Sequence, residues 1–538
     1  MKVALTFLGI CIAFIICTYY GTTEYFIASP MLMAKHIMQA AHLPQKFFET
    51  PDSFWKSHAN KYISYCGSSL LIVTLNLISG TDAYIFRYLP LILIPFLLIV
   101  RLIFLIPVRK NNSSYIVSSI LFVLYVIYIV ANAAYQWRLT YQALGFISHI
   151  YILYILVKTI ISARRFSIPD YLIMMLFFSI SLLNYYTMST ISITFVLSLG
   201  LGFLLFERRY VSQIGILFGL GLSFFILYFN YDIMWTTILS SSQKNLLNVP
   251  SILIGSFSRY IFGNPPSEEL FASGFPVIVS PEDRILSIIA HLFWGLAPII
   301  LVIIFSLIIN VENKLRNSAL SLILASLVTA GWESFPYVLA FGVFNLRYLI
   351  RFTPIVTLLI LLIFSGNKRV RWQKVILYVF LLWFIIATVY QIKVPFLRDN
   401  VGGIASQKLE LINYPEYQSL AYLSTSSYNL YSNFQVSGEI WLSSIKINKS
   451  WEVSISPFQN KVYLFLNCSD DLDLKMFKNK FEMPAILILT RTDFLKPVWG
   501  DFHGYAIKPI RQDVAFLFKK SFDIIYNSGR LIAYSIIS

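Results

Sequence analysis

The sequence predicts an α-helical polytopic membrane protein with about eleven transmembrane helices and an extracytoplasmic C-terminal α/β domain. Three observations predict this class. Hydrophobic residues make up 57% of the 538 residues and charged residues only 13%, and the mean hydropathy is +0.70. Apolar runs of about 20 residues, the length that crosses a bilayer as helix, recur along the chain. Basic residues cluster in every second connection between these runs, which is the pattern that topology in a membrane produces.

The candidate spans end near residue 391, and residues 392–538 follow them as a tail. Helices long enough to cross the hydrocarbon core are predicted at 3–20, 88–107, 115–135, 142–161, 171–187, 190–206, 213–230, 285–309, 318–343, 347–365 and 374–391. One further run, 63–79, is shorter and carries serine, threonine and asparagine side chains. If it lies at the outer interface, the N-terminus is cytoplasmic and 21–87 is one outer loop. If it spans instead, there are about twelve helices and the N-terminus is outside. Its polarity and Lys2 favour the interface.

Much of the formal net charge of +16 belongs to short connections between spans. Basic residues near span ends stay on the cytoplasmic side, where they also meet anionic lipid headgroups. We therefore assign the charge to topology and to the membrane, and expect no nucleic acid partner. The chain is expected in the plasma membrane, with its N-terminus in the cytoplasm and its C-terminal domain outside. The basic groups are Arg109/Lys110, Arg164/Arg165, Arg208/Arg209, Lys314/Arg316 and Lys368/Arg369/Arg371.

Two units follow from this topology. Residues 1–391 form the transmembrane module, with large outer loops at 21–87 and 231–284. Residues 392–538 form an extracytoplasmic domain, since nearly this length suffices for a folded unit. Its apolar runs are short, at 461–466, 485–490, 505–510, 522–526 and 531–537. The last two flank Asn527-Ser528-Gly529, a hairpin-type connection. An α/β or mostly β domain is expected. The four cysteines are too scattered for a disulfide framework or a metal cluster.

Acidic and histidine side chains in the first outer loop are the candidate catalytic residues. Glu24 follows the first span directly, where a carboxylate can take a proton from an acceptor or bind a divalent metal such as Mg²⁺ or Mn²⁺. Asp52 and His58 lie in the segment before 63–79 and can ligate a metal or bind phosphate. An interfacial charge in contact with water is the alternative interpretation of Glu24, and solvated or structural roles are the alternative for the other two.

Arginines at span ends are the candidate phosphate-binding residues. Arg347 and Arg351 open the tenth span one helical turn apart, so both guanidinium groups lie on one face. A guanidinium fork fits phosphate well, and charge inside the membrane usually faces a cavity or a partner. Arg87 opens the second span. The alternatives are snorkelling to the headgroups or, for the pair, an ion pair with Glu333 on the preceding helix, which is itself more often structural than catalytic.

The chain contains no Walker loop, nucleotide-binding glycine pattern, nucleophile elbow or zinc signature. Its layout instead resembles the GT-C superfamily of integral-membrane glycosyltransferases. Members have an acidic residue shortly after the first span and an amphipathic stretch after it, here Glu24-Tyr-Phe-Ile-Ala-Ser-Pro-Met. A His- or Pro-containing segment follows and leads into an interfacial helix that ends at Gly, here Ser57-His58 to Ser79-Gly80. An arginine then opens the second span, here in Tyr84-Ile-Phe-Arg-Tyr-Leu-Pro90.

The resemblance implies transfer of a sugar from a polyprenyl-phosphate donor to a lipid, glycan or protein acceptor on the outer face. It implies that Glu24 acts on the acceptor or binds a metal, and that Arg87, Arg347 and Arg351 meet the lipid phosphate. Where the family often has Asp-Asp, Asp-Glu or Glu-His, this chain has Thr23-Glu24. The alternatives are a transporter or flippase of lipid-linked sugars, and an envelope polysaccharide polymerase or ligase. A transporter would show paired broken helices and internal symmetry, which the sequence does not display.

Overall fold

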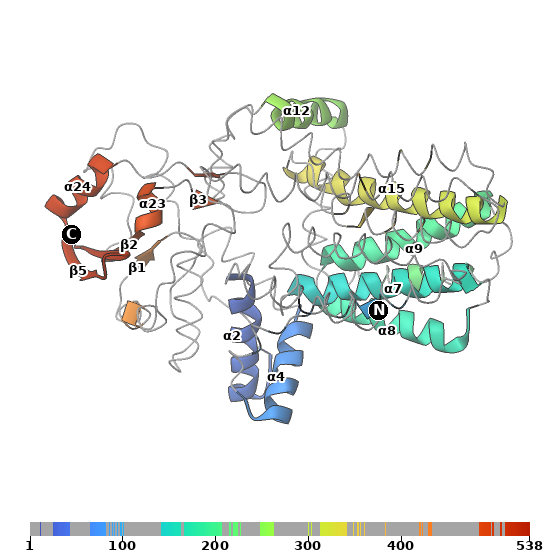
Figure 1. The fold of residues 1–538 in the computed structure, drawn as a ribbon, viewed down its shortest axis with the longest axis horizontal. Coiled ribbons are helices and arrows are strands. Elements are labelled where there is room, and N and C mark those ends of the chain that lie inside the picture. Colours follow the sequence, from blue (N-terminus) through green and yellow to red (C-terminus); the bar gives the residue numbers. More distant parts are fainter. Residues whose placement is uncertain are drawn as a thin grey trace.

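The computed structural model describes part of the chain, mostly as helices, with a small four-stranded sheet and a separate strand pair toward the C-terminus (Figure 1). The described residues are 11, 25–43, 65–81, 86, 89, 91, 94, 97–98, 101, 141–162, 166–184, 186–206, 215–216, 219–223, 226, 248–262, 300, 303, 313–341, 348, 352–353, 356, 360, 382, 419–420, 422, 429–432, 484–495, 498–499, 506–507, 512–522, 523–537.

Four helices form the described part of a bundle and run roughly along the long axis of the molecule (Figure 1). They are α7 (Tyr141–Ser162), α8 (Ile168–Asn184), α9 (Tyr186–Phe206) and α15 (Asn313–Phe341). Two of them, α7 and α15, are long and apolar enough to cross a membrane by length and composition. At about 1.5 Å per residue, the 22 residues of α7 extend about 33 Å.

The direction of these helices alternates, which gives the bundle two distinct ends. The Nζ atom of Lys158, near the end of α7, lies 3.8 Å from the Oδ1 atom of Asp170 in the first turn of α8. The side-chain amide of Asn317 donates to the Phe206 carbonyl at 2.7 Å, so α15 begins where α9 ends. The connections that follow α7 and α9, and the start of α15, therefore share one end. We call this the basic end. In the sequence, Arg164/Arg165 follow α7, Arg208/Arg209 follow α9, and Lys314/Arg316 belong to the start of α15.

Local sequence explains how the helices begin and how closely they pack. Before α8, the hydroxyl and the amide of Ser167 both donate to the Asp170 carboxylate, at 2.6 and 3.0 Å, as in a capping box. Between α9 and α15, a Cβ atom on Gly202 would lie 2.9 Å from the Ser321 Cα atom. Small residues permit this close approach of two helices in a membrane bundle.

The expected spans that fall on described residues are helical. The spans predicted at 142–161, 171–187, 190–206 and 318–343 correspond to α7, α8, α9 and α15, with ends that differ by up to a few residues. The span at 3–20 and those at 88–107, 213–230, 285–309, 347–365 and 374–391 are represented only by single residues or short helical pieces. The span at 115–135 lies outside the described residues.

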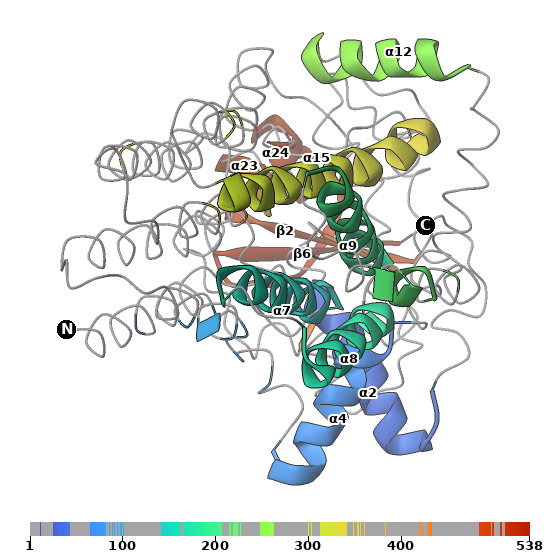
Figure 2. The ribbon, with the colours of Figure 1, turned by 90° about the vertical axis from the view of Figure 1, so that its right-hand side faces the viewer.

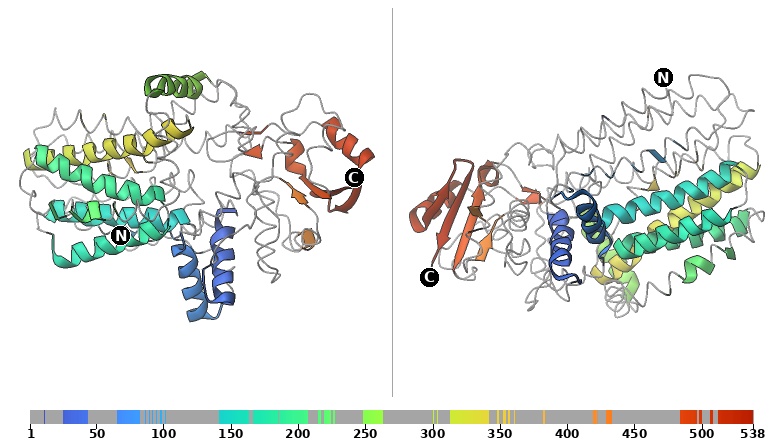
Figure 3. Two further views of the ribbon diagram at one scale, coloured as in Figure 1. Left: turned by 180° about the vertical axis from the view of Figure 1, so that it is seen from behind. Right: turned by 90° about the horizontal axis from the view of Figure 1, so that it is seen from below.

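Helices α2 (Tyr25–Ala40) and α4 (Gly67–Ser79) pack against each other across the end of the bundle opposite the basic end. Figures 1 and 3 show both at a large angle to the bundle helices, on the side that faces the C-terminal sheet. The 13 residues of α4 extend about 20 Å, less than the roughly 30 Å hydrocarbon core. Helix α12 (Val249–Phe262) lies within the predicted second outer loop.

The C-terminal part of the chain contains a four-stranded sheet in the order β1-β2-β6-β5. Its strands are β1 (Asn429–Tyr431), β2 (Ala485–Thr490), β5 (Asp523–Asn527) and β6 (Leu531–Ile536). Strand β1 is parallel to β2, and the other neighbours are antiparallel. A separate pair joins β3 (Val498–Trp499) to β4 (Ala506–Ile507). Viewed along the bundle, this sheet lies behind the helices (Figure 2).

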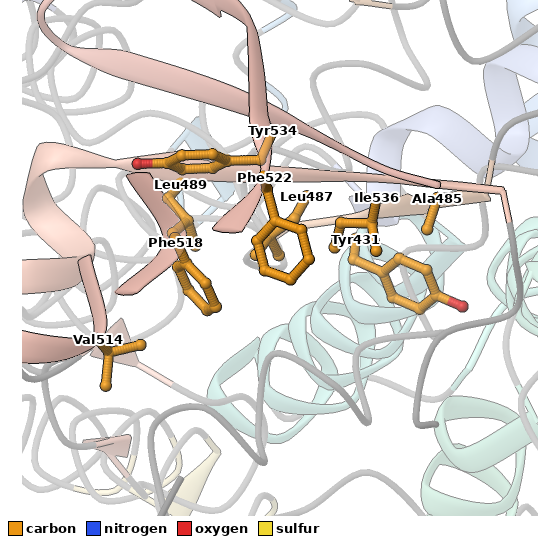
Figure 4. Close-up of a cluster of buried hydrophobic side chains, with 9 residues drawn as sticks. All are labelled: Tyr431, Ala485, Leu487, Leu489, Val514, Phe518, Phe522, Tyr534 and Ile536. Carbon is orange, nitrogen blue, oxygen red and sulfur yellow. The ribbon is translucent and has the colours of Figure 1, made fainter. Parts of the chain in front are cut away.

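Helix α24 (Gln512–Ser521) packs on one face of this sheet, and the side chains between the helix and the sheet form a hydrophobic core. Phe518 and Phe522 meet side chains of β1, β2 and β6 in the cluster drawn in Figure 4. The expected hairpin is confirmed: Gly529 has a φ of 78°, and the Ser528 amide donates to the Leu531 carbonyl at 3.0 Å. The expected run 485–490 is a strand, whereas only 506–507 of the run 505–510 is described as strand. The expected run 461–466 lies outside the described residues.

Candidate functional site

The candidate site residues predicted from the sequence lie outside the residues that the structure describes. They are Glu24, Asp52, His58, Arg87, Arg347 and Arg351. Their neighbours in sequence are described in several cases, and these neighbours locate the segments to which the candidates belong. Tyr25, the first residue of α2, follows Glu24 directly. Tyr348 follows Arg347, and Phe352 follows Arg351.

The segment that begins at Tyr348 forms helical hydrogen bonds. The amide of Phe352 donates to the Tyr348 carbonyl, and the amide of Val356 donates to the Phe352 carbonyl, both at 2.9 Å. These are the i to i−4 bonds of an α-helix. Tyr348, Phe352 and Val356 are buried. The helical spacing predicted for Arg347 and Arg351 is therefore present between Tyr348 and Phe352, the residues that directly follow them.

Glu333 of α15 contacts this segment directly. Its Oε2 atom accepts a hydrogen bond from the Tyr348 amide at 2.6 Å, and only 4% of the Glu333 residue is exposed. The sequence predicted a structural role for Glu333 through an ion pair. The structure gives it a backbone partner, the peptide amide that joins Arg347 to Tyr348. A carboxylate that accepts from a backbone amide makes one of the stronger hydrogen bonds in proteins.

On its other side, the same segment packs against a buried histidine of α7. The His149 ring lies edge-on to Phe352, with centroids 4.5 Å apart, and edge-on to Tyr348 at 5.9 Å. Phe195 of α9 makes a third edge contact at 5.6 Å. The Nδ1 atom of His149 lies 3.1 Å from the Ser192 hydroxyl. The His149 residue is fully buried, so the imidazole joins three helical segments in the interior of the bundle.

Glu333 and His149 lie at a similar depth from the end of the bundle that carries α2 and α4. His149 is eight residues after Tyr141, the start of α7, and Glu333 is eight residues before Phe341, the end of α15. Each offset corresponds to about 12 Å along a helix. Both residues therefore lie beneath the same end as the predicted outer loop 21–87.

Helix α4 is anchored to this end by a buried polar contact. The Ser68 hydroxyl donates to the Oδ1 atom of Asn184, the last residue of α8, at 2.9 Å. The Asn184 side-chain amide in turn donates to the Ile180 carbonyl at 2.6 Å. A Cβ atom on Gly67 would lie 2.5 Å from the Nδ2 atom of Asn184, so a larger residue at this position would overlap the Asn184 side chain. The helix pair α2 and α4 and the bundle thus meet in a close, hydrogen-bonded contact.

At the far end of α2, two histidines lie together. The rings of His36 and His42 are 5.3 Å apart in an edge arrangement, and the His42 Nδ1 group donates to the Leu43 carbonyl at 2.9 Å. Ala41 between them has a φ of 58°, the left-handed conformation that ends α2. Burial, and after it the charge of His42, lower the pKa of His36, so this imidazole is neutral at neutral pH.

No group of three histidine, cysteine, aspartate or glutamate side chains suited to a metal ion occurs within the described part of the chain. The expected metal site at Glu24 lies outside that part. The described residues therefore give no ligand set for Mg²⁺ or Mn²⁺, and we derive no chemical step through a metal.

The sequence reasoning did not single out His149, Ser192 or Tyr348. A signal for His149 was present, because an ionisable side chain within an otherwise apolar span is a candidate for function or for a specific partner. Tyr348 and Ser192 gave no such signal, since tyrosine and serine are frequent in these spans. Only the packing of three segments that are distant in sequence brings them together.

Comparison with known proteins gives no match: no protein-family model matches the chain, and no curated protein is significantly similar to it.

Proposed function

We propose that this protein is a membrane glycosyltransferase that moves a sugar from a polyprenyl-phosphate donor to an acceptor on the outer face. In this proposal Glu24 acts as the general base on the acceptor, with Asp52 and His58 as further candidates. Arg347, Arg351 and Arg87 bind the phosphate of the donor. A phosphate leaving group at a membrane surface needs nearby positive charge, and an attacking hydroxyl needs an acceptor for its proton.

The observation that carries the proposal is the position of α2 and α4. They cross the end of the bundle opposite the basic end, on the side of the C-terminal sheet (Figure 3). If the basic connections are cytoplasmic, as basic residues near span ends usually are, then α2, α4 and the sheet lie outside. The short α4 then lies at the outer interface, which favours the topology with about eleven spans.

The surroundings of Tyr348 give further support. The residues that follow the two candidate arginines are held by Glu333 and His149 beneath the end that carries α2, which itself begins directly after Glu24. The candidate base Glu24 and the candidate phosphate-binding residue Arg347 thus adjoin, in sequence, described residues at the same end of the bundle. A sugar transferase with a lipid-phosphate donor needs both groups close together, so the shared end of their sequence neighbours supports the proposal.

The direct test uses purified full-length protein in lipid nanodiscs, supplied with labelled polyprenyl-phosphate sugars and extracts that contain candidate acceptors. We expect time-dependent consumption of at least one donor, release of polyprenyl phosphate and appearance of the label in a new product. A transporter would move the donor across a vesicle membrane without consuming it. Unchanged donors with every sugar and acceptor tried, together with movement across the bilayer, would replace the enzyme proposal with transport.

The arginine pair gives a second test of the donor site. Replacing Arg347 or Arg351 with lysine keeps the positive charge and removes the bidentate fork. A hydrogen bond to a charged group contributes about 1.5–3 kcal/mol, so donor affinity should fall about tenfold or more in either variant. Titration with polyprenyl phosphate in nanodiscs measures this effect. Wild-type affinity in both variants would mean that the arginines contact headgroups of the bilayer instead.

A further inference from the structure

We propose that the two histidines at the far end of α2, His36 and His42, are the protein ligands of a binding site for a divalent transition-metal ion of the zinc type. His36 belongs to the last turns of α2, and His42 follows the helix after the turn at Ala41. Neither histidine belongs to the proposed sugar-transfer site. The inference is therefore independent of the proposed function.

The separation of the two rings fits this role. Their centroids are 5.3 Å apart, and the ring planes stand at 74° to each other, so the rings are not stacked. A zinc–nitrogen bond of about 2.0–2.1 Å puts the ion roughly 3.2 Å from the centre of each ring, and a tetrahedral angle at the ion then places the two centres about 5 Å apart. The two imidazoles are therefore already spaced as two ligands of one ion.

The protonation of both rings suits coordination. The Nδ1 group of His42 donates to the Leu43 carbonyl at 2.9 Å, which leaves the lone pair of the neutral ring on Nε2. A histidine that binds a metal usually donates its other ring N–H to such a partner. Burial, more than the charge of His42, lowers the pKa of His36, so this imidazole also keeps a lone pair at neutral pH. Coordination takes one nitrogen of each ring and leaves the other for a hydrogen bond, so it is compatible with further contacts of His36.

The backbone between the two histidines has an unusual conformation that brings them together. Ala41 has a φ of 58°, in the left-handed region that residues other than glycine seldom adopt. Its amide donates to the Ile37 carbonyl at 2.9 Å, so the turn closes directly on the last turn of α2. This turn places His42 beside His36. Backbone conformations that cost energy are found most often at functional sites, which agrees with a ligand at this turn.

The chemistry of imidazole selects the class of ion. Imidazole nitrogen suits Zn²⁺, Cu²⁺ and Ni²⁺, whereas Mg²⁺ and Mn²⁺ prefer oxygen ligands. Two protein ligands are fewer than the four of a closed structural zinc site, so water completes the coordination shell. His42 is exposed and His36 is half-buried, which gives the ion access from solution. The site is therefore an exchangeable one that responds to the concentration of the free ion.

The test uses full-length protein in nanodiscs, with the protein and the scaffold both prepared without polyhistidine tags. Competition with a chromophoric zinc indicator measures the affinity for Zn²⁺. His42→Gln is the main variant, because replacement of an exposed side chain leaves the fold intact. We expect it to weaken binding of the tightest Zn²⁺ about tenfold or more, at least the loss seen when a hydrogen-bond partner of a metal ligand is removed. The matched control His503→Gln, a histidine in the C-terminal part of the chain, should bind Zn²⁺ like the wild type.

The turn at Ala41 provides a second pair of variants that leaves both histidines in place. Ala41→Gly keeps the left-handed conformation accessible, whereas Ala41→Val disfavours it, because a β-branched residue almost never adopts a positive φ. We expect Ala41→Gly to bind Zn²⁺ like the wild type and Ala41→Val to bind it more weakly. Pulsed EPR of the Cu²⁺-loaded protein should show coupling to two imidazoles in the wild type and to one in His42→Gln.

Equal Zn²⁺ affinity of the wild type and His42→Gln would overturn the proposal and leave an adventitious ion only. Displacement of Zn²⁺ by an equal concentration of Mg²⁺ would also overturn it, because oxygen ligands rather than imidazole would then hold the ion. None of these measurements involves sugar transfer, so failure of the proposed function would leave their outcome unchanged.

Discussion

At the scale of single residues, the contact between Gly67 and Asn184 is where the helix pair α2 and α4 meets the bundle. Asn184 is 1% exposed and bonded to both Ser68 and the Ile180 carbonyl, so its side chain cannot move aside without losing buried hydrogen bonds. Gly67 is required here for lack of space rather than for an unusual backbone angle. Helix α4 lies against the Asn184 side chain at the end of α8, where a Cβ atom on residue 67 would have no space.

We therefore expect Gly67→Ala to destabilise the protein by about 1–3 kcal/mol, the usual cost of overpacking. Gly331→Ala is the matched control, since Gly331 lies within α15 with open space around its Cβ position. Alanine there should be neutral or stabilising by up to about 1 kcal/mol, as expected when glycine leaves a helix interior. Thermal unfolding in nanodiscs measures both. Equal stability of the two variants would contradict the close contact.

Residue identity predicted the candidate carboxylates and arginines but not their surroundings. Glu333 was noticed because a carboxylate within an apolar run is costly, and the structure finds it buried with a backbone partner. Its partner could not be predicted, because a backbone amide leaves no trace in the sequence. The contacts of His149 likewise depend on how α7, α9 and the segment from Tyr348 pack, which no local pattern specifies.

At the scale of elements, helix α24 has one face buried against the sheet and another exposed. Phe518 is fully buried against the sheet, whereas Phe516 on the same helix is 70% exposed (Figure 4 shows Phe518 within the core). We expect Phe518→Ala to cost about 3–5 kcal/mol, as for other buried phenylalanines. Phe516→Ala should change stability by no more than about 0.5 kcal/mol, as at other surface positions.

Limited proteolysis of the full chain within residues 484–537 measures this difference, because cleavage of a folded domain follows its opening. Phe518→Ala should be cut much faster than the wild type, and Phe516→Ala at nearly the wild-type rate. Similar cleavage of both variants would mean that the sheet and α24 do not form one core.

Elements with a strong local signal were predicted well. The four bundle helices follow from long apolar runs, and the β5–β6 hairpin follows from Asn527-Ser528-Gly529 between two apolar stretches. Helices α12 and α24 were not predicted, because their apolar residues are fewer and interrupted by polar ones. The parallel pairing of β1 with β2 was also out of reach, since more than fifty residues separate these strands and only tertiary packing brings them together.

At the scale of the whole molecule, the two ends of the bundle predict a topology. If α2, α4 and the C-terminal sheet are outside, a cysteine at Ser53 should react with an impermeant thiol reagent added to intact cells, as should the native Cys468. Cys66 is buried and should stay protected in the folded protein, which provides an internal control. Labelling of position 53 only after permeabilisation would favour the alternative topology in which 63–79 crosses the membrane.

Glu24→Gln tests the central claim, sugar transfer at the outer end of the bundle, most directly. The change keeps size and hydrogen bonding and removes the charge that takes up the acceptor proton. Loss of a general base costs roughly 10²–10⁴-fold in rate, so transfer from the polyprenyl-phosphate sugar should fall by about a hundredfold or more. Glu268→Gln, in the second outer loop, is the matched control and should transfer at the wild-type rate. Wild-type transfer by a folded Glu24→Gln protein would contradict the assignment and direct the search to Asp52 and His58.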